Sequence, residues 1–501
     1  KDAIPGAGGA DDLDYLKSGL LVVQLQSKDG SVLKQLAADY EFVLLGHVGE
    51  EAWLVRLYDA SNVPAIQADD QVRWAGSMLP SWRISPVLDG TEDYYSLVVS
   101  PDLHSEQFPD LVIDLQDMGA TDAWCGSHIC EVRGQIDIGR ISHDSRIIFV
   151  EASAGLVLTN AAASTAVGVA TMNSASTFNL YGSGETIMFA DTGLDINHPD
   201  IVGRVVGVDT QFGLDPSPAD SNGGHGTHIA LTLAGDGSGD TSATGIAPEA
   251  SLLGYAFEHD ATGVFGRRGS IYDLFTAADQ MGSRIGVNAW GIDANHGSYT
   301  SDSRSVDYYV NDNPLFLPLF AIGDDSGQNA NHIMPPSTAK NSLSIGASTT
   351  TSSGETANFS SQGPTLDGRI KPDLIAPGVT ICSGRAEEAM TPLGSPCGSG
   401  SHGNGNDFYM SMSGTSQATA VAGGSAALVR EFLREQVGIS SPSAALIKAA
   451  MINGAQDTGA ADIPNAHEGW GMIDLDRTIL AKDGATDLTT FRDDSRLLNP
   501  G

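Results

Sequence analysis

Short apolar segments alternate with glycine-rich turns and helical patterns through the second part of the chain, and this alternation constrains the fold more than any other feature. Strands buried on both faces have near-continuous apolar runs, because helices cover both sides of a parallel sheet. We therefore predict one large α/β domain at residues 161–484, followed by a polar tail at residues 485–501. The prediction rests on the segments 186–190, 251–256, 284–288, 315–322 and 342–346.

Two shorter stretches precede this domain and share one order of elements: strand, helix, strand, strand, helix, strand. The first occupies residues 19–90, and the second occupies residues 95–159. We predict two small α/β modules of the ferredoxin-like type, at residues 1–92 and 93–160. Residues 160–178 are mostly small and polar, which fits either a linker where the chain is processed or an ordinary surface loop.

The charge balance excludes two classes of partner. The chain has 26 Lys and Arg residues against 62 Asp and Glu residues, which gives a net charge of −36. Such a surface repels phosphate backbones and anionic lipid headgroups, so we expect no nucleic-acid partner and no adsorption to an anionic membrane. No apolar run reaches the length of about 18 residues that indicates a transmembrane helix, so no membrane span is expected.

The four cysteines fall into two close pairs, Cys125 with Cys130 and Cys382 with Cys397. Neither pair is accompanied by a second Cys or His pair at the spacing of a zinc site, so a cysteine-bound metal is not expected. Two local disulfides in a secreted protein are favoured over four free thiols.

Three segments place a reactive side chain beside glycines. Asp191 ends an apolar run and precedes Thr-Gly, and a carboxylate at the tip of a buried strand can orient a histidine with little competition from water. His225 lies in Gly-His-Gly-Thr-His at the start of a helical pattern, without the carboxylate of an HExxH metal motif, which favours a general base. Ser416 follows Gly-Thr at the start of an Ala-rich helix, whose N–H groups and dipole favour a developing negative charge.

Each of these segments also has an ordinary structural interpretation. Asp191 fits a structural turn, and Ser416 fits a helix N-cap. His228, the second histidine of the Gly-His-Gly-Thr-His motif, fits helix packing. Taken together, however, the chain order Asp191, His225, Ser416 matches one of the orders in which serine-protease triads occur. The three residues are therefore predicted to act as one catalytic unit.

Further motifs occur between residues 175 and 484. They are YGSGETIMFADTGLDINHPDI, NGGHGTHIA, FSSQGPTLDGRIKPDLIAPG, MSGTSQATAVAGG and EGWGMIDLD, together with NAWGIDANHGSYTSDSRSVDYYV and STAKNSLSIGAS. With these motifs the chain resembles the subtilase family of serine endopeptidases, and the last two make it most similar to the oxidatively stable alkaline subtilases of bacteria. The resemblance implies a subtilisin-like parallel-sheet α/β/α catalytic domain, and makes the two N-terminal modules a pro-region.

The resemblance also implies roles for individual residues. Ser416 would be the nucleophile and would supply one oxyanion donor through its backbone N–H, with His225 as general base and then acid, and Asp191 orienting His225. An extended polypeptide substrate would add as a β-strand to two edges, next to a specificity pocket bordered by small residues. The first edge consists of Gly263, Val264 and Phe265, and the second consists of Asn288, Ala289, Trp290 and Gly291. The pocket residues are Ala321, Ile322 and Gly323. The resemblance also predicts a cis bond at Pro335-Pro336.

The chain departs from the family pattern at the oxyanion position, where Asp324 replaces an asparagine donor. The loss of one donor costs about 10²–10³ in kcat, and an ionised carboxylate also repels the oxyanion. Because a protonated carboxyl group can donate a hydrogen bond, we expect slow or acid-biased activity. Gln417 stands where Met is common, which removes an oxidisable thioether. Leu231, Ala289 and Ala420 also differ from the usual residues.

We therefore predict a secreted subtilisin-like serine endopeptidase whose N-terminal modules act as a folding chaperone and as an intramolecular inhibitor. The maturation cut is expected at residues 158–163. The alternative is a subtilase-fold protein that serves as a non-catalytic scaffold or binding component of an extracellular assembly. The intact Asp191, His225 and Ser416 favour the enzyme, whereas Asp324 favours the scaffold.

The predicted chemistry requires no cofactor. The family resemblance implies structural Ca²⁺, and residues 215–220 form an Asp-rich loop with the oxygen ligands that Ca²⁺ prefers. Carboxylates are abundant in this chain, so no calcium ligands are assigned. The sequence likewise assigns no oligomeric state.

Overall fold

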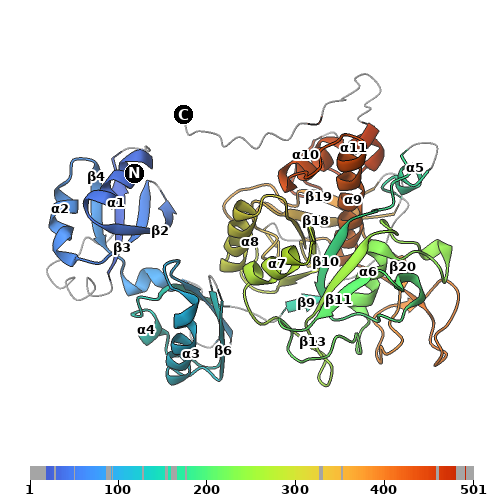
Figure 1. Ribbon diagram of the computed structural model, residues 1–501, viewed down its shortest axis with the longest axis horizontal. Helices are drawn as coiled ribbons and strands as arrows, with labels where there is room; N and C mark the ends of the chain where they lie inside the picture. Colours follow the sequence, from blue (N-terminus) through green and yellow to red (C-terminus); the bar gives the residue numbers. More distant parts are fainter. Residues whose placement is uncertain are drawn as a thin grey trace. The chain divides into compact units, whose positions relative to one another are not determined.

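The computed structural model of the 501-residue chain divides into two compact units, Lys1–Ser153 and Ala154–Gly501. Figure 1 labels the helices and strands of both units. The described residues are 19–26, 30–49, 51–85, 88, 92, 94–126, 129–152, 156–158, 166–174, 178–325, 331–350, 354–458, 462–480 and 491.

The first unit contains two four-stranded antiparallel sheets with the same topology. The first sheet has the order β2-β3-β1-β4, and the second has the order β6-β7-β5-β8. The first module consists of β1 (Leu20–Leu25), α1 (Gly30–Asp39), β2 (Phe42–Gly49), β3 (Ala52–Leu57), α2 (Val63–Ala68) and β4 (Val72–Ser77). The second consists of β5 (Tyr94–Val99), α3 (Phe108–Asp117), β6 (Asp122–Cys125), β7 (Ile129–Arg133), α4 (Ile138–Ile141) and β8 (Ile147–Ala152).

This shared strand order confirms the prediction of two ferredoxin-like modules. Each module has an apolar core of its own, one around Val23 and one around Leu97. A further cluster, which includes Val22 and Val98, joins residues of both sheets. Cys125 and Cys130 lie opposite each other on β6 and β7 and form the first expected disulfide.

The second unit is built on a seven-stranded sheet in the order β11-β12-β10-β15-β17-β18-β19, in which all neighbouring strands are parallel. This confirms the predicted parallel-sheet α/β fold. The strands are β10 (Thr186–Asp191), β11 (Val205–Asp209), β12 (Ser251–Ala256), β15 (Ile285–Asn288), β17 (Leu317–Ala321), β18 (Leu343–Ser348) and β19 (Leu374–Pro377).

Helices cover both faces of this sheet (Figure 1). Successive residues of β10 point to opposite faces, as the period of a strand requires: Ile187 packs in one core cluster and Met188 in the other. The first cluster includes α6 (His225–Ala234), α9 (Thr415–Glu435) and α10 (Ala444–Gly454), and the second includes α7 (Ile271–Gln280) and α8 (Ser301–Asp312). Two shorter helices are α5 (Val169–Met172) and α11 (Leu475–Leu480).

Three small antiparallel sheets complete the second unit. The hairpin β13 (Glu258–His259) with β14 (Val264–Phe265) follows β12, and β16 (Trp290–Ile292) pairs with β9 (Leu156–Leu158). The third sheet contains β20 (Ile381–Gly384), β21 (Ser395–Pro396) and β22 (Tyr409–Met412). It carries the second expected disulfide, Cys382–Cys397. The Pro335-Pro336 bond is cis, as the sequence predicted. Across the described residues, no helix has the length and apolarity of a membrane span.

Candidate active site

The predicted catalytic residues lie at the ends of elements of the parallel sheet domain. Asp191 is the last residue of β10, His225 is the first residue of α6, and Ser416 is the second residue of α9. All three side chains are buried. Gly224 precedes α6 with φ +75°, a backbone conformation that residues with a Cβ rarely adopt, and this conformation sets the start of the helix.

Asp191 and His225 form a hydrogen-bonded pair. The Nδ1 nitrogen of His225 donates to Oδ1 of Asp191 at 2.6 Å, and the backbone N–H of Thr192 donates to the same oxygen at 2.8 Å. Both side chains have 0% exposed area. Because the carboxylate holds the proton on Nδ1, the Nε2 nitrogen of the neutral ring is left as the basic one.

The hydroxyl group of Thr192 connects the end of β10 to Asp220 and to the first turn of α6. It donates to Oδ1 of Asp220 at 2.8 Å and accepts from the backbone N–H of Gly226 at 2.7 Å. Asp220 also accepts from the backbone N–H of Thr227 at 2.7 Å. A Cβ at Gly226 would lie 2.2 Å from the carbonyl oxygen of Gly193, so the close approach of α6 to the end of β10 requires glycine.

Burial shifts the pKa of two carboxyl groups and one imidazole near the pair. Burial raises the pKa of Asp220, and it raises the pKa of Glu258 to about 7, although Asn222 donates a hydrogen bond to Glu258. Burial, with a smaller contribution from the neighbouring His225, lowers the pKa of His228 to about 3. His228 is therefore neutral at physiological pH.

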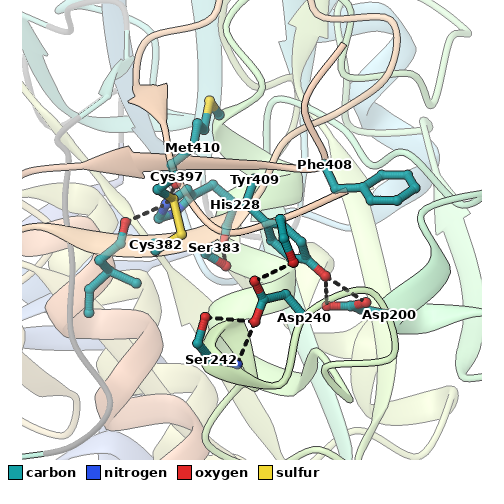
Figure 2. The surroundings of a disulfide bond; sticks show 12 residues. Asp200, His228, Asp240, Ser242, Cys382, Ser383, Cys397, Phe408, Tyr409 and Met410 are labelled. Atoms are coloured by element: carbon teal, nitrogen blue, oxygen red, sulfur yellow. Dashed lines mark hydrogen bonds between the residues drawn. A yellow bond between two sulfur atoms is a disulfide. The ribbon is translucent and has the colours of Figure 1, made fainter. Parts of the chain in front are cut away.

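His228 connects the strand pair β20–β22 to the residue after the predicted nucleophile. Its Nε2 nitrogen donates toward the carbonyl oxygens of Ile381, at 3.2 Å, and Met410, at 3.1 Å. Nδ1 is therefore the acceptor, and it lies 3.0 Å from Nε2 of Gln417. Figure 2 shows His228 among Ser383, Met410 and the Cys382–Cys397 disulfide. Gln417, which differs from the usual family residue, therefore contacts His228. The sequence alone did not predict this contact.

The hydroxyl group of Ser416 is held by the predicted substrate-binding segment. It donates to the carbonyl oxygen of Ala289 at 2.5 Å, at the junction between β15 and β16. Asn288 donates to the carbonyl oxygen of Leu319, and Trp290 donates to that of Ala190, at 3.2 and 3.0 Å. These bonds anchor the segment to the central strands.

The backbone of β9 lies along this same segment. The pairing is antiparallel, with Leu158 opposite Trp290, Val157 opposite Gly291 and Leu156 opposite Ile292. The predicted edge residues Trp290 and Gly291 thus pair with a strand of the chain itself.

Asp324 follows β17, and its side chain reaches the first turn of α9. Its Oδ1 oxygen accepts a hydrogen bond from the backbone N–H of Thr415 at 2.7 Å, and the hydroxyl group of Thr415 accepts from the backbone N–H of Gly323 at 3.2 Å. A carboxylate at a helix N-terminus is favoured by the helix dipole. The structure therefore brings Asp324 next to the residue that precedes Ser416.

The remaining predicted residues lie in two places. Ala321 and Ile322 are buried, and Gly323, with φ +102°, follows them towards Asp324. Val264 and Phe265 lie on the separate β13–β14 hairpin. There Val264 is 49% exposed and offers a surface, whereas Phe265 packs into the core, and Gly263 precedes them with φ +65°.

The family model of the subtilases matches residues 182–471. Serine protease AprX of Bacillus subtilis is 32% identical over 273 residues, which are 50% of this chain and 58% of that protein. Thermitase of Thermoactinomyces vulgaris is 30% identical over 249 residues, which are 50% of this chain and 75% of that protein. The chain spans only 20% and 23% of two serine protease/ABC transporter B family proteins of Dictyostelium discoideum.

Two solved structures share the fold. Fervidolysin of Fervidobacterium pennivorans matches with a TM-score of 0.56 and 19% identity, over 79% of this chain and 62% of that chain. The CspB protease of Clostridium perfringens matches with a TM-score of 0.52 and 15% identity, over 63% of this chain and 96% of that chain. With the family model matching more than half of its residues, the chain belongs to the subtilase family of peptidases.

Proposed function

We propose that this protein is a serine endopeptidase that hydrolyses polypeptides through an acyl-enzyme on Ser416. The buried hydrogen bond between His225 and Asp191, at 2.6 Å, carries the proposal, because a catalytic imidazole must be held in one tautomer. Subtilase membership supports the reaction class.

The proposed reaction uses Ser416 and His225 in turn. The Oγ oxygen of Ser416 attacks the scissile carbonyl carbon while its proton passes to Nε2 of His225. His225 then gives this proton to the leaving amine as the C–N bond breaks. Water hydrolyses the resulting ester with the same histidine as base. No cofactor takes part in these steps, and the backbone N–H of Ser416 is one donor to the tetrahedral oxyanion.

Asp324 is proposed to make this peptidase slow at neutral pH. An ionised carboxylate has no hydrogen to donate, and its negative charge opposes the oxyanion. The hydrogen bond from the Thr415 N–H, at 2.7 Å, supports an ionised side chain, because hydrogen bonds to a carboxylate favour its charged form. Protonation at lower pH would convert Asp324 into a donor, which gives an acid-biased activity.

The N-terminal modules are proposed to be a pro-region whose C-terminal end inhibits the enzyme. Support comes from β9, which is paired with β16 directly after Ala289, where an extended substrate would add as a strand. The proposed maturation cut, at residues 158–163, lies outside the described residues except for Leu158. The domain boundaries at residues 92, 160 and 484 remain part of this proposal.

The two disulfides, Cys125–Cys130 and Cys382–Cys397, support secretion into an oxidising environment. Structural calcium remains a prediction without assigned ligands. In the Asp-rich loop, Asp215 accepts from the backbone N–H groups of Ser217 and Asp260, and Asp220 is committed to Thr192 and Thr227. These hydrogen bonds give no support for calcium at that loop.

The competing function is a non-catalytic scaffold, which Asp324 favours. Labelling with a fluorophosphonate probe separates the two, because the probe reacts only with an activated serine. We expect slow labelling that is lost in Ser416→Ala and strongly reduced in His225→Ala. Labelling that survives in Ser416→Ala, or a complete lack of labelling from acid to neutral pH after removal of residues 1–160, which include β9, would favour the scaffold.

A further inference from the structure

Three side chains from separate segments converge beside the loop that carries Asp324. His296 follows β16, Asp325 follows Asp324 after β17, and His332 precedes the cis proline pair. One donor atom from each of the three lies within 4.8 Å of the others. The side chains are 21%, 47% and 29% exposed in this order.

The groups already face one another. Nδ1 of His332 lies 2.6 Å from Oδ2 of Asp325, and the two imidazole rings are 5.2 Å apart between centroids. The Nε2 nitrogen of His296 is buried and makes no hydrogen bond, although Oδ1 of Asp293 lies 3.1 Å away. A buried ring nitrogen without a hydrogen bond, next to a second imidazole and two carboxylates, has the composition of a metal-binding group.

We propose that His296, Asp325 and His332 bind a zinc ion, with Asp293 close enough to act as a fourth ligand or to orient His296. Imidazole nitrogens and carboxylate oxygens are ordinary zinc ligands at about 2.0–2.2 Å, and small side-chain rotations close the observed spacing. Two imidazoles disfavour Ca²⁺ and Mg²⁺, which take oxygen ligands.

The proposed zinc ion would connect the three segments that carry His296, Asp325 and His332, next to the candidate active site. Asp325 is held by its backbone N–H, which donates to Oγ of Ser361 at 3.2 Å, and its neighbour Asp324 accepts from the N–H of Thr415. The binding itself requires only His296, Asp325 and His332, so it stands whether or not Ser416 proves to be a nucleophile.

Calorimetric titration of the full chain with ZnCl₂ tests the proposal. The titration is done in excess MgCl₂, so that Mg²⁺ occupies the many surface carboxylates. We expect one zinc ion per chain and a rise in the unfolding temperature on its addition. Because loss of even an outer partner of a metal ligand lowers affinity about tenfold or more, His296→Gln and His332→Gln should each weaken binding by at least that factor.

His143→Gln is the matched control, because this histidine lies in the N-terminal unit next to Gly139 and should leave zinc binding unchanged. The unfolding temperature without zinc shows whether each variant is folded. X-ray absorption at the zinc edge of the wild-type protein counts imidazole ligands independently of any variant, and two are expected. A wild-type protein that takes up no zinc, a zinc spectrum without imidazole, or folded His296 and His332 variants that bind like wild type would overturn the proposal.

Discussion

Replacement of Asp324 by asparagine should raise peptide hydrolysis near neutral pH. The Oδ1 oxygen of Asp324 lies 2.7 Å from the backbone nitrogen of Thr415. An asparagine keeps an acceptor at this position, so the side chain can retain its orientation while an NH₂ group replaces the second oxygen. The substitution thus exchanges a carboxylate for a donor without a change of size.

Two energies set the magnitude. A missing oxyanion donor costs about 2.7–4 kcal/mol, or about 10²–10³ in kcat. Two unit charges about 4 Å apart at an effective dielectric near 20 repel by about 4 kcal/mol. Such contributions are not additive, so we take the donor alone as the lower bound and expect Asp324→Asn to raise kcat by at least about 10²-fold.

The assay is the kcat for a chromogenic peptide, measured from acid to alkaline pH after removal of residues 1–160, which include β9, and with a chelator present. Asp324→Asn should abolish the acid bias that we propose for the wild-type protein. Asp325→Asn is the matched control, because it removes the neighbouring carboxylate, which is 47% exposed, and leaves Asp324 in place. The reasoning fails if Asp324→Asn leaves kcat unchanged while Ser416 reacts with the probe, or if Asp325→Asn gives the same gain.

Three further outcomes are expected. Gln417→Leu removes the donor to Nδ1 of His228 and leaves a buried acceptor unpaired, so urea unfolding should show a loss of about 1–3 kcal/mol. The pKa of Glu258 is about 7 in the folded state and near 4.5 in the unfolded state, so the folded state binds more protons between these values. The free energy of unfolding should therefore fall as pH rises through this interval. Glu258→Gln should flatten this pH dependence, measured by thermal unfolding at several pH values. Val157→Pro removes a backbone N–H from the strand opposite Gly291 and should speed peptide hydrolysis by the uncleaved chain, whereas Val157→Ala, which keeps this N–H, should leave the rate unchanged.

The fold was predictable because hydrophobic periodicity reports burial directly. The apolar run 186–190 became β10, and the run 251–256 became β12 with the same limits, because strands buried on both faces leave little freedom in residue type. The two small modules were predictable for the same reason, and their repeated element order led to the same strand order in both sheets. The pairing of β9 with β16 was not predictable, since a strand of three residues carries almost no pattern.

The site was predictable only in part. Asp191, His225 and Ser416 are marked by glycines and by their positions at element ends, which leave a signal along the chain. The contact of Gln417 with His228 leaves none, because a polar residue inside a helix gives no indication of its partner across the core. The position of Asp324 was recognised, but its hydrogen bond to Thr415 depends on how the loop after β17 meets the start of α9.

The contacts of Ser416 and Asp324 together suggest that two separate restraints act on the nucleophile. The hydroxyl group of Ser416 donates to the carbonyl oxygen of Ala289, and in the proposed mechanism its proton passes to His225 during attack. Ala289 directly precedes the strand that β9 covers, so release of β9 frees this segment to respond to substrate. In the proposed mechanism, Asp324 acts later, on the oxyanion. Removal of residues 1–160, which include β9, should therefore raise the rate of probe labelling at Ser416 even with Asp324 in place, whereas turnover of a peptide should remain slow until Asp324 is replaced or protonated.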